Sequence, residues 1–187
     1  MEAKHKNALI GALLAVVFVM AVGYAAFAQQ LTINGSAEIT SRWDVHMKQE
    51  GAIATPSSTM GTKPSGDVQV AGGGLTATFN TELVSPGDTV TYVIPIENKG
   101  TIDARLSTIT LSSETPEMVV DNGSLTATTK DGDIKYTVTS PGNGTLAANT
   151  GTANVTIVAE FVNKAEGQGN LQNLSANLTV TMNYVQA

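Results

Sequence analysis

Apolar and polar residues alternate along most of this chain with a period of two. The longest such run lies between residues 31 and 47, where odd positions are mostly apolar and even positions mostly polar. Its larger odd-position members are Leu31, Ile33, Ala37, Ile39, Trp43, Val45 and Met47. Successive side chains of a strand point to opposite faces, so the pattern predicts one long strand over residues 29–50 with one buried face. The parity of Trp43 favours a packed anchor over an exposed adhesive aromatic side chain.

The same alternation recurs in the second half of the chain. It predicts strands at residues 90–96, 155–161 and 176–184, and shorter ones at 75–79, 104–111, 125–129 and 134–139. After residue 28 no stretch has the 3.6-residue apolar stripe of a helix. Thr and Val, which are branched at Cβ and fit a pleated surface, are abundant. The pattern therefore predicts an all-β chain.

Glycine-containing turns separate these predicted strands. They lie at residues 85–88, 98–100, 130–133 and 141–144, spaced as a sandwich or jelly roll requires. Residues 51–74 are rich in Gly, Pro, Ser and Thr, which predicts a partly mobile linker with a short strand at 68–70. We therefore expect an antiparallel jelly-roll-like β-sandwich over residues 75–187, preceded by the linker and the separate first strand.

The first 28 residues have the parts of a secretory signal peptide. Lys4 and Lys6 precede an uncharged run from Ala8 to Ala28 that ends in small residues. We expect a signal peptidase to cleave among Ala25, Ala26, Ala28 and Gln29, after either Ala25 or Ala28. The run of 21 residues equals the ~20 needed to cross a bilayer, so an uncleaved anchor is the alternative. The sequence favours cleavage and secretion.

Charge and cysteine content exclude several classes of partner. The net charge is −6, and removing residues 1–28 takes away two Lys and one Glu, which leaves −7. An acidic surface disfavours nucleic acid and anionic lipid, whose phosphates reward clusters of Lys and Arg. The chain has no cysteine, so its stability depends on burial and backbone pairing rather than disulfides. Expected partners are other copies of the chain, cell wall or matrix components, and the export signal peptidase.

Residues for catalysis or metal binding are scarce. The mature chain has one histidine, His46, which its even position predicts to face outward. A zinc protease needs two imidazoles and a base, and a serine hydrolase needs a histidine base, so we expect no enzyme, metal or cofactor. Asp131-Gly132-Asp133 could supply oxygen ligands to calcium, but a hairpin turn explains Asp-Gly without an ion and is favoured.

A long amphipathic strand on a flexible linker can pair in two ways. It can add to its own sheet or to the open edge of a neighbour, because the hydrogen bonds are the same. Head-to-tail insertion into the next molecule gives a contact that does not close, so a filament grows.

Several segments resemble the camelysin and TasA family of exported biofilm fibre subunits. They are Tyr24-Ala25-Ala26-Phe27, residues 31–37, Trp43-Asp44-Val45, and the Pro86-Gly87-Asp88 turn leading to Glu97-Asn98-Lys99-Gly100. The resemblance implies a jelly-roll sandwich, export with signal-peptide removal, and polymerisation in which the N-terminal segment completes a neighbour's sheet. It also implies a donor strand that spans about residues 29–48.

The stretch from Pro86 to Gly100 also resembles Ig-like repeats of bacterial surface proteins. Such repeats act as stalks or adhesive spacers, so a membrane-anchored surface adhesin is the alternative function. A single copy in a chain of 187 residues favours the fibre subunit. The mass of the exported protein separates the two, because the adhesin keeps residues 1–28.

Overall fold

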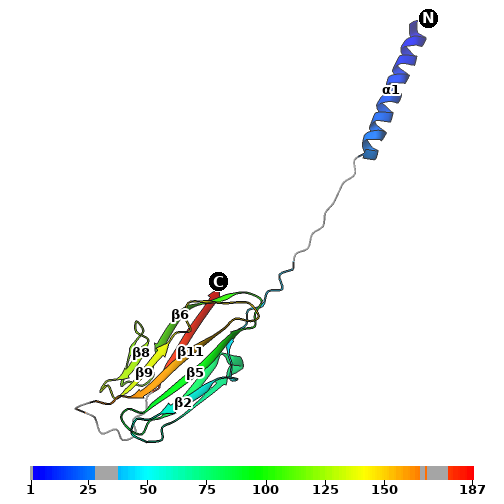
Figure 1. Ribbon diagram of the computed structural model, residues 1–187. Coiled ribbons are helices and arrows are strands. Elements are labelled where there is room, and N and C mark those ends of the chain that lie inside the picture. The colour runs from blue at the N-terminus through cyan, green and yellow to red at the C-terminus, as the bar shows by residue number, and fades with distance from the viewer. Residues whose placement is uncertain (1, 28–37, 165–166, 168–176) are drawn as a thin grey trace. The chain divides into compact units, whose positions relative to one another are not determined.

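The computed structural model describes residues 2–27, 38–164, 167 and 177–187. The chain divides into two compact units, Met1–Ile39 and Thr40–Ala187. The first unit contains the helix α1 (Glu2–Phe27). Among the described residues, no helix is both long and apolar enough to cross a membrane. The second unit consists of antiparallel β-sheets, so the chain is mostly β with one N-terminal helix (Figure 1).

The largest sheet has seven strands. Its order is β1-β5-β11-β9-β8-β7, and β2 pairs with β5 on the same side as β1. Their bounds are β1 Val45–Met47, β2 Ile53–Ser57, β5 Thr89–Asn98, β7 Met118–Asp121, β8 Thr126–Thr129, β9 Ile134–Thr139 and β11 Thr152–Phe161. The long strands β5 and β11 pair over nine residues and form the centre of the sheet.

Two smaller sheets complete the unit. One has the order β10-β6-β12, with bounds Thr145–Leu146, Ala104–Ser112 and Thr179–Gln186. The other pairs β3 (Ser65–Ala71) with β4 (Thr76–Glu82) through the short 3₁₀ turn η1 (Gly72–Gly74). The antiparallel sheets include one that curls into a half-barrel.

One apolar cluster joins the three sheets. It contains the inward side chains of β5 and β11 together with residues of β3, β6, β8, β9 and β10 and Leu178, the residue before β12. On β5 the alternate residues Val90, Tyr92, Ile94 and Ile96 are at most 2 % exposed. The alternation in the sequence therefore marks the face of each strand that enters the core.

Most expected strands of the body are confirmed. Residues 90–96, 104–111, 125–129, 134–139 and 155–161 lie in or within one residue of strands, and the short strand at 68–70 lies within β3. Of the strand expected at 176–184, residue 176 lies outside the described residues, residues 177–178 form no strand, and residues 179–184 lie in β12.

The structure differs from two expectations near the N-terminus. Residues 51–74, expected to be a linker, contain β2 and β3, because a strand at a sheet edge tolerates Pro56 and neighbouring polar residues. Of the strand expected over residues 29–50, the described part forms a paired strand only at Val45–Met47, which pairs with Ile96–Asn98 of the same chain. Residues 38–44 form no strand, and 28–37 lie outside the described residues.

The Pro86-Gly87-Asp88 turn is built around a buried carboxylate. Asp88 is 0 % exposed and accepts hydrogen bonds from the backbone N–H groups of Val84 and Ser85 and from Thr62 Oγ1. Burial by itself raises the pKa of Asp88. These hydrogen bonds and one from Ser58 together have the larger effect and lower the pKa from the ordinary 3.8 to about 2. The turn thus joins the loop after β2 to the start of β5.

Candidate functional site

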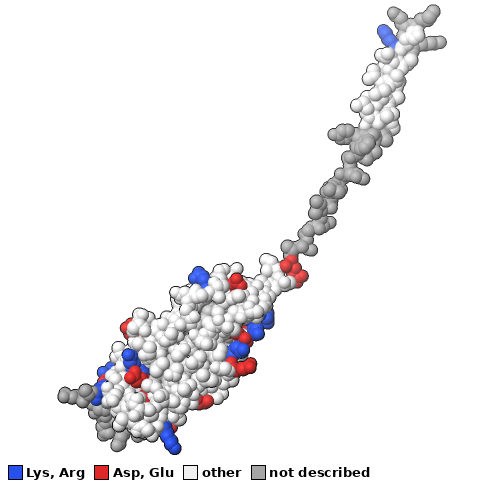
Figure 2. All heavy atoms as spheres, viewed as in Figure 1, with Lys and Arg blue, Asp and Glu red and all other residues white. Residues whose placement is uncertain are grey.

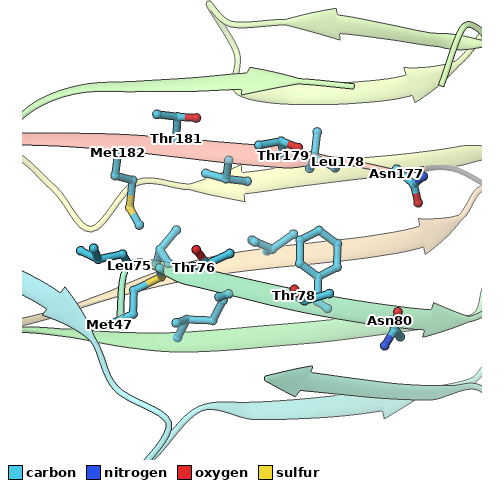
Figure 3. A pocket seen from close by; sticks show the side chains of 16 residues that line it. Met47, Leu75, Thr76, Thr78, Asn80, Asn177, Leu178, Thr179, Thr181 and Met182 are labelled. Carbon is cyan, nitrogen blue, oxygen red and sulfur yellow. The ribbon is translucent and has the colours of Figure 1, made fainter. Parts of the chain in front are cut away.

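Two strands of the body have an unpaired edge facing a common groove. In the described part of the chain, β4 pairs only with β3, and β12 pairs only with β6. The groove between them is lined from β4 by residues 76–80 and from β12 and the residues before it by 177–182. Figure 3 shows these two strands on opposite sides of the gap. Each unpaired edge offers backbone N–H and C=O groups to an added strand.

Apolar and uncharged polar side chains line the groove, which carries no charge. Its volume is about 560 Å³, and its inner lining includes Ile94, Val155 and Ile157 from the two central strands. Phe79 and Val180 contribute from the walls. Among the described residues that line it, none is acidic, basic or histidine. An uncharged segment with apolar side chains on one face is therefore the kind of ligand that the groove suits.

Charged side chains lie elsewhere on the body. Figure 2 shows them scattered over the visible face rather than gathered into one patch. No group of three or more His, Cys, Asp or Glu side chains within the described ranges could hold a metal ion.

The structure separates the residues expected on the donor strand. Leu31, Ile33 and Ala37 lie outside the described residues. The remaining four are Ile39 (87 % exposed), Trp43 (47 % exposed), Val45 and Met47. Val45 and Met47 pack against the core of their own chain through β1, and Met47 lines the groove. Trp43, expected to be packed, precedes β1 and is about half exposed to solvent.

The expected cleavage region lies at the end of α1. Ala25 and Ala26 are in its last turn, and Ala28 and Gln29 fall outside the described residues.

His46 does not simply face outward as expected. Its Nδ1 lies 2.8 Å from Asp44 Oδ1 and its Nε2 lies 3.0 Å from Glu97 Oε1, so the ring is held between two carboxylates. Lys48 and Lys99 approach the other Glu97 oxygen at 3.4 and 3.6 Å. Burial raises the pKa of Glu97, but the two lysines and hydrogen bonds from Lys48 and His46 produce a net lowering. The cluster fastens β1 to β5.

The residues before β1 are also bound to the body. The Asp44 carbonyl accepts hydrogen bonds from the N–H groups of Lys99 (2.8 Å) and Gly100 (3.2 Å). The backbone of Arg42 exchanges two hydrogen bonds with Thr101. The segment from Arg42 to Met47 therefore runs along the end of β5 and the loop that follows it.

The Asp131-Gly132-Asp133 segment forms a turn between β8 and β9. Gly132 has φ 74°, and its N–H donates to the Thr129 carbonyl. Asp133 is 0 % exposed and forms an ion pair with Lys164 at 2.5 Å. A lysine at this position disfavours a cation beside the same carboxylate, in line with the expected turn.

Comparison with models of protein families, with curated proteins and with solved structures found no match to this chain.

Proposed function

We propose that this chain is a secreted, non-enzymatic subunit that polymerises into extracellular fibres, and that its N-terminal segment completes the sheet of another copy. The observation that carries this proposal is the uncharged groove between the unpaired edges of β4 and β12. A strand inserted there joins the two smaller sheets into one. The body is then a jelly-roll-like sandwich whose second layer becomes complete only on assembly.

The segment before β1 suits this groove in composition. Residues 29–41 contain one charged residue, Glu38, and their odd positions include Leu31, Ile33, Ala37 and Ile39. Backbone hydrogen bonds to two edges supply affinity, and alternate apolar side chains supply specificity. Each large side chain buried in the groove adds ~1.5–3 kcal/mol before ordering costs. Exposure of Ile39 at 87 % leaves it available for burial by a partner.

Val45 and Met47 no longer belong to the donor segment on this account. Their pairing with β5 and packing on the core make them the anchor that joins the donor to its own body. The donor is therefore shorter than the segment expected from alternation alone. It ends before Arg42, whose hydrogen bonds to Thr101 mark the start of the anchor.

The resemblance to camelysin and TasA points to the same function. Export with cleavage near Ala28 frees the donor from α1, and the expected location is the extracellular matrix or cell surface. The proposed partner is another copy, with cell wall or matrix components beside it. The proposal needs no cofactor, nucleic acid or catalytic group.

Two matched substitutions test the proposal. Ile33→Asp places a charge on the face directed into the groove, whereas Thr32→Asp places the same charge on the opposite face. Both lie outside Thr40–Ala187, so the body keeps its fold, which circular dichroism checks. We expect electron microscopy to find fibres for Thr32→Asp and none for Ile33→Asp. Normal fibres from Ile33→Asp would rule out insertion.

The intact mass of the exported protein tests processing. Loss of residues 1–25 or 1–28 is expected for the fibre subunit. Retention of the full N-terminus together with an absence of fibres would favour the anchored adhesin instead.

A further inference from the structure

The groove has two chemically different ends. Met47, Leu75 and Met182 gather at one end, which we call the methionine end, while Asn80 and Asn177 lie at the other, the asparagine end (Figure 3). The strands that line it run in opposite directions. β4 runs from the methionine end to the asparagine end, and β12 runs the other way. An inserted strand is therefore parallel to one wall and antiparallel to the other.

The N-terminal segment leaves its own body at the methionine end. Met47 lines the groove there, and the chain then runs back through Val45, which pairs with Asn98, to Arg42 on the following loop. Ile94 of β5 lines the groove, and Asn98 lies four residues farther along that strand. The residues that join the donor to its body, Arg42 to Met47, thus begin beyond the methionine end of the body's own groove.

Because the N-terminal segment leaves at the methionine end, the direction of insertion determines whether the assembly is an open filament or a closed dimer. If the donor enters a second copy at the asparagine end, both copies have the same orientation, and the contact repeats without closing. If it enters at the methionine end, the second copy is inverted and its own donor points back at the first. Mutual exchange then closes a two-fold dimer and growth stops.

We propose that the donor enters the second copy at its asparagine end and lies parallel to β4 and antiparallel to β12, with Leu31 nearest the methionine end. This inference rests on the proposed function and specifies the orientation of the partner. It places every subunit of a fibre head to tail, with the free N-terminus inside the next groove.

The distribution of side chains along the donor supports this direction. The large apolar residues Leu31 and Ile33 come first, and Glu38 and the polar residues 40–41 come last. In the proposed direction Leu31 and Ile33 meet the methionine end, and Glu38 lies at the asparagine end beside solvent. In the reverse direction Leu31 and Ile33 lie toward Asn80 and Asn177, and Glu38 lies toward Met47 and Leu75.

Engineered disulfides can determine the direction because the chain has no cysteine. Thr32 and Glu38 occupy even positions of the donor, and the exposed residues of the β12 edge share the outward face. Each full-length variant carries two cysteines. One is at donor position 32 or 38, and the other is at one acceptor position of the β12 edge. The acceptor changes are Asn177→Cys, Thr179→Cys, Thr181→Cys and Asn183→Cys. The outermost acceptors are six residues, or ~20 Å, apart, far beyond the reach of one disulfide.

The proposed direction predicts a crossed pattern. Thr32→Cys gives a ladder of covalent multimers on non-reducing gels with Cys at 181 or 183, and Glu38→Cys gives it with Cys at 177 or 179. The reverse pattern overturns the direction while leaving strand insertion intact. Covalent dimers without higher multimers overturn it in favour of closed pairs.

Other outcomes separate failure of the direction from failure of the proposed function. Disulfides formed within single chains mean that the donor folds back into its own groove, which overturns both. The absence of any cross-link and of any fibre also overturns both. Thr76→Cys and Asn80→Cys on the β4 edge repeat the test if a change in β12 unfolds the body, and Thr32→Cys is then expected to link only to position 76.

Discussion

Arg42 and Thr101 exchange two hydrogen bonds at the start of the folded body. The Arg42 N–H donates to Thr101 Oγ1 at 2.8 Å, and the Thr101 N–H donates to the Arg42 carbonyl at 2.9 Å. This pair holds the last residues before β1 against the loop after β5. The pair therefore fixes the point at which the segment before Arg42 leaves the folded body.

Gly100 makes this attachment possible because it has no side chain. A Cβ at position 100 would lie 2.6 Å from the Arg42 carbonyl oxygen and 2.8 Å from the Asp44 nitrogen. We expect Gly100→Ala to detach this segment and to raise the rate of tryptic cleavage after Arg42 about tenfold, which corresponds to ~1.4 kcal/mol of local stability. Gly144→Ala is the control, since nothing lies within 4 Å of its added Cβ. Equal cleavage rates for the two variants would contradict the role given to Gly100.

Asp88 should contribute to stability only when it is ionised. Its pKa of about 2 is below the ordinary 3.8, so its contribution is complete above pH 3.8 and is lost as the pH falls toward 2. Asp88→Asn replaces an acceptor of several hydrogen bonds and should lower the free energy of unfolding by ~2 kcal/mol at pH 7. Urea unfolding at pH 7 and pH 2 measures the difference, which should shrink at the lower pH.

The exposed Asp67 provides the control for this prediction. It lies on β3, and its carboxylate accepts hydrogen bonds from the side-chain amide of the exposed Gln69. Asp67→Asn should leave the unfolding free energy nearly unchanged at both pH values. A loss of stability in Asp88→Asn that does not depend on pH would show that the charge of Asp88 is unimportant.

The two lysines beside Glu97 should hold its pKa down. Replacing Lys99 by Met removes one positive charge 3.6 Å from the carboxylate, so the pKa of Glu97 should rise. NMR titration of the side-chain carboxyl carbon measures this change. Lys130→Met removes a lysine paired instead with Glu117 and should leave Glu97 unaffected. An unchanged Glu97 titration in Lys99→Met would mean that the neighbouring charge has no effect.

Alternation in the sequence was sufficient to find the strands that enter the core. Val90 to Ile96 and Val155 to Phe161 alternate cleanly because one face of each strand packs inside and the other meets solvent. The strand β2 was missed because it lies on the edge of the sheet, where Pro56 is tolerated and little apolar area is needed. Edge position is a property of the tertiary structure, not of the segment.

The groove could not be predicted for a related reason. The residues of β4 and β12 were expected to form strands. Their alternation of apolar and polar residues does not show that, within the described body, each strand lacks a partner on one side. Likewise, the alternation from Leu31 to Met47 continues through Val45, although that residue pairs with β5 and the preceding described residues form no strand. A periodic pattern gives the buried face of a strand but not the chain that covers it.

The most direct test of the central claim compares a chain beginning at Gln29 with one beginning at Thr40. The shorter chain keeps the whole unit Thr40–Ala187, including β1 and the Arg42 hydrogen bonds, and lacks nearly all of the donor. Negative-stain electron microscopy and sedimentation should find filaments for the longer chain and monomers for the shorter one. Filaments from both chains, or monomers from both at every concentration, would contradict assembly through the N-terminal segment.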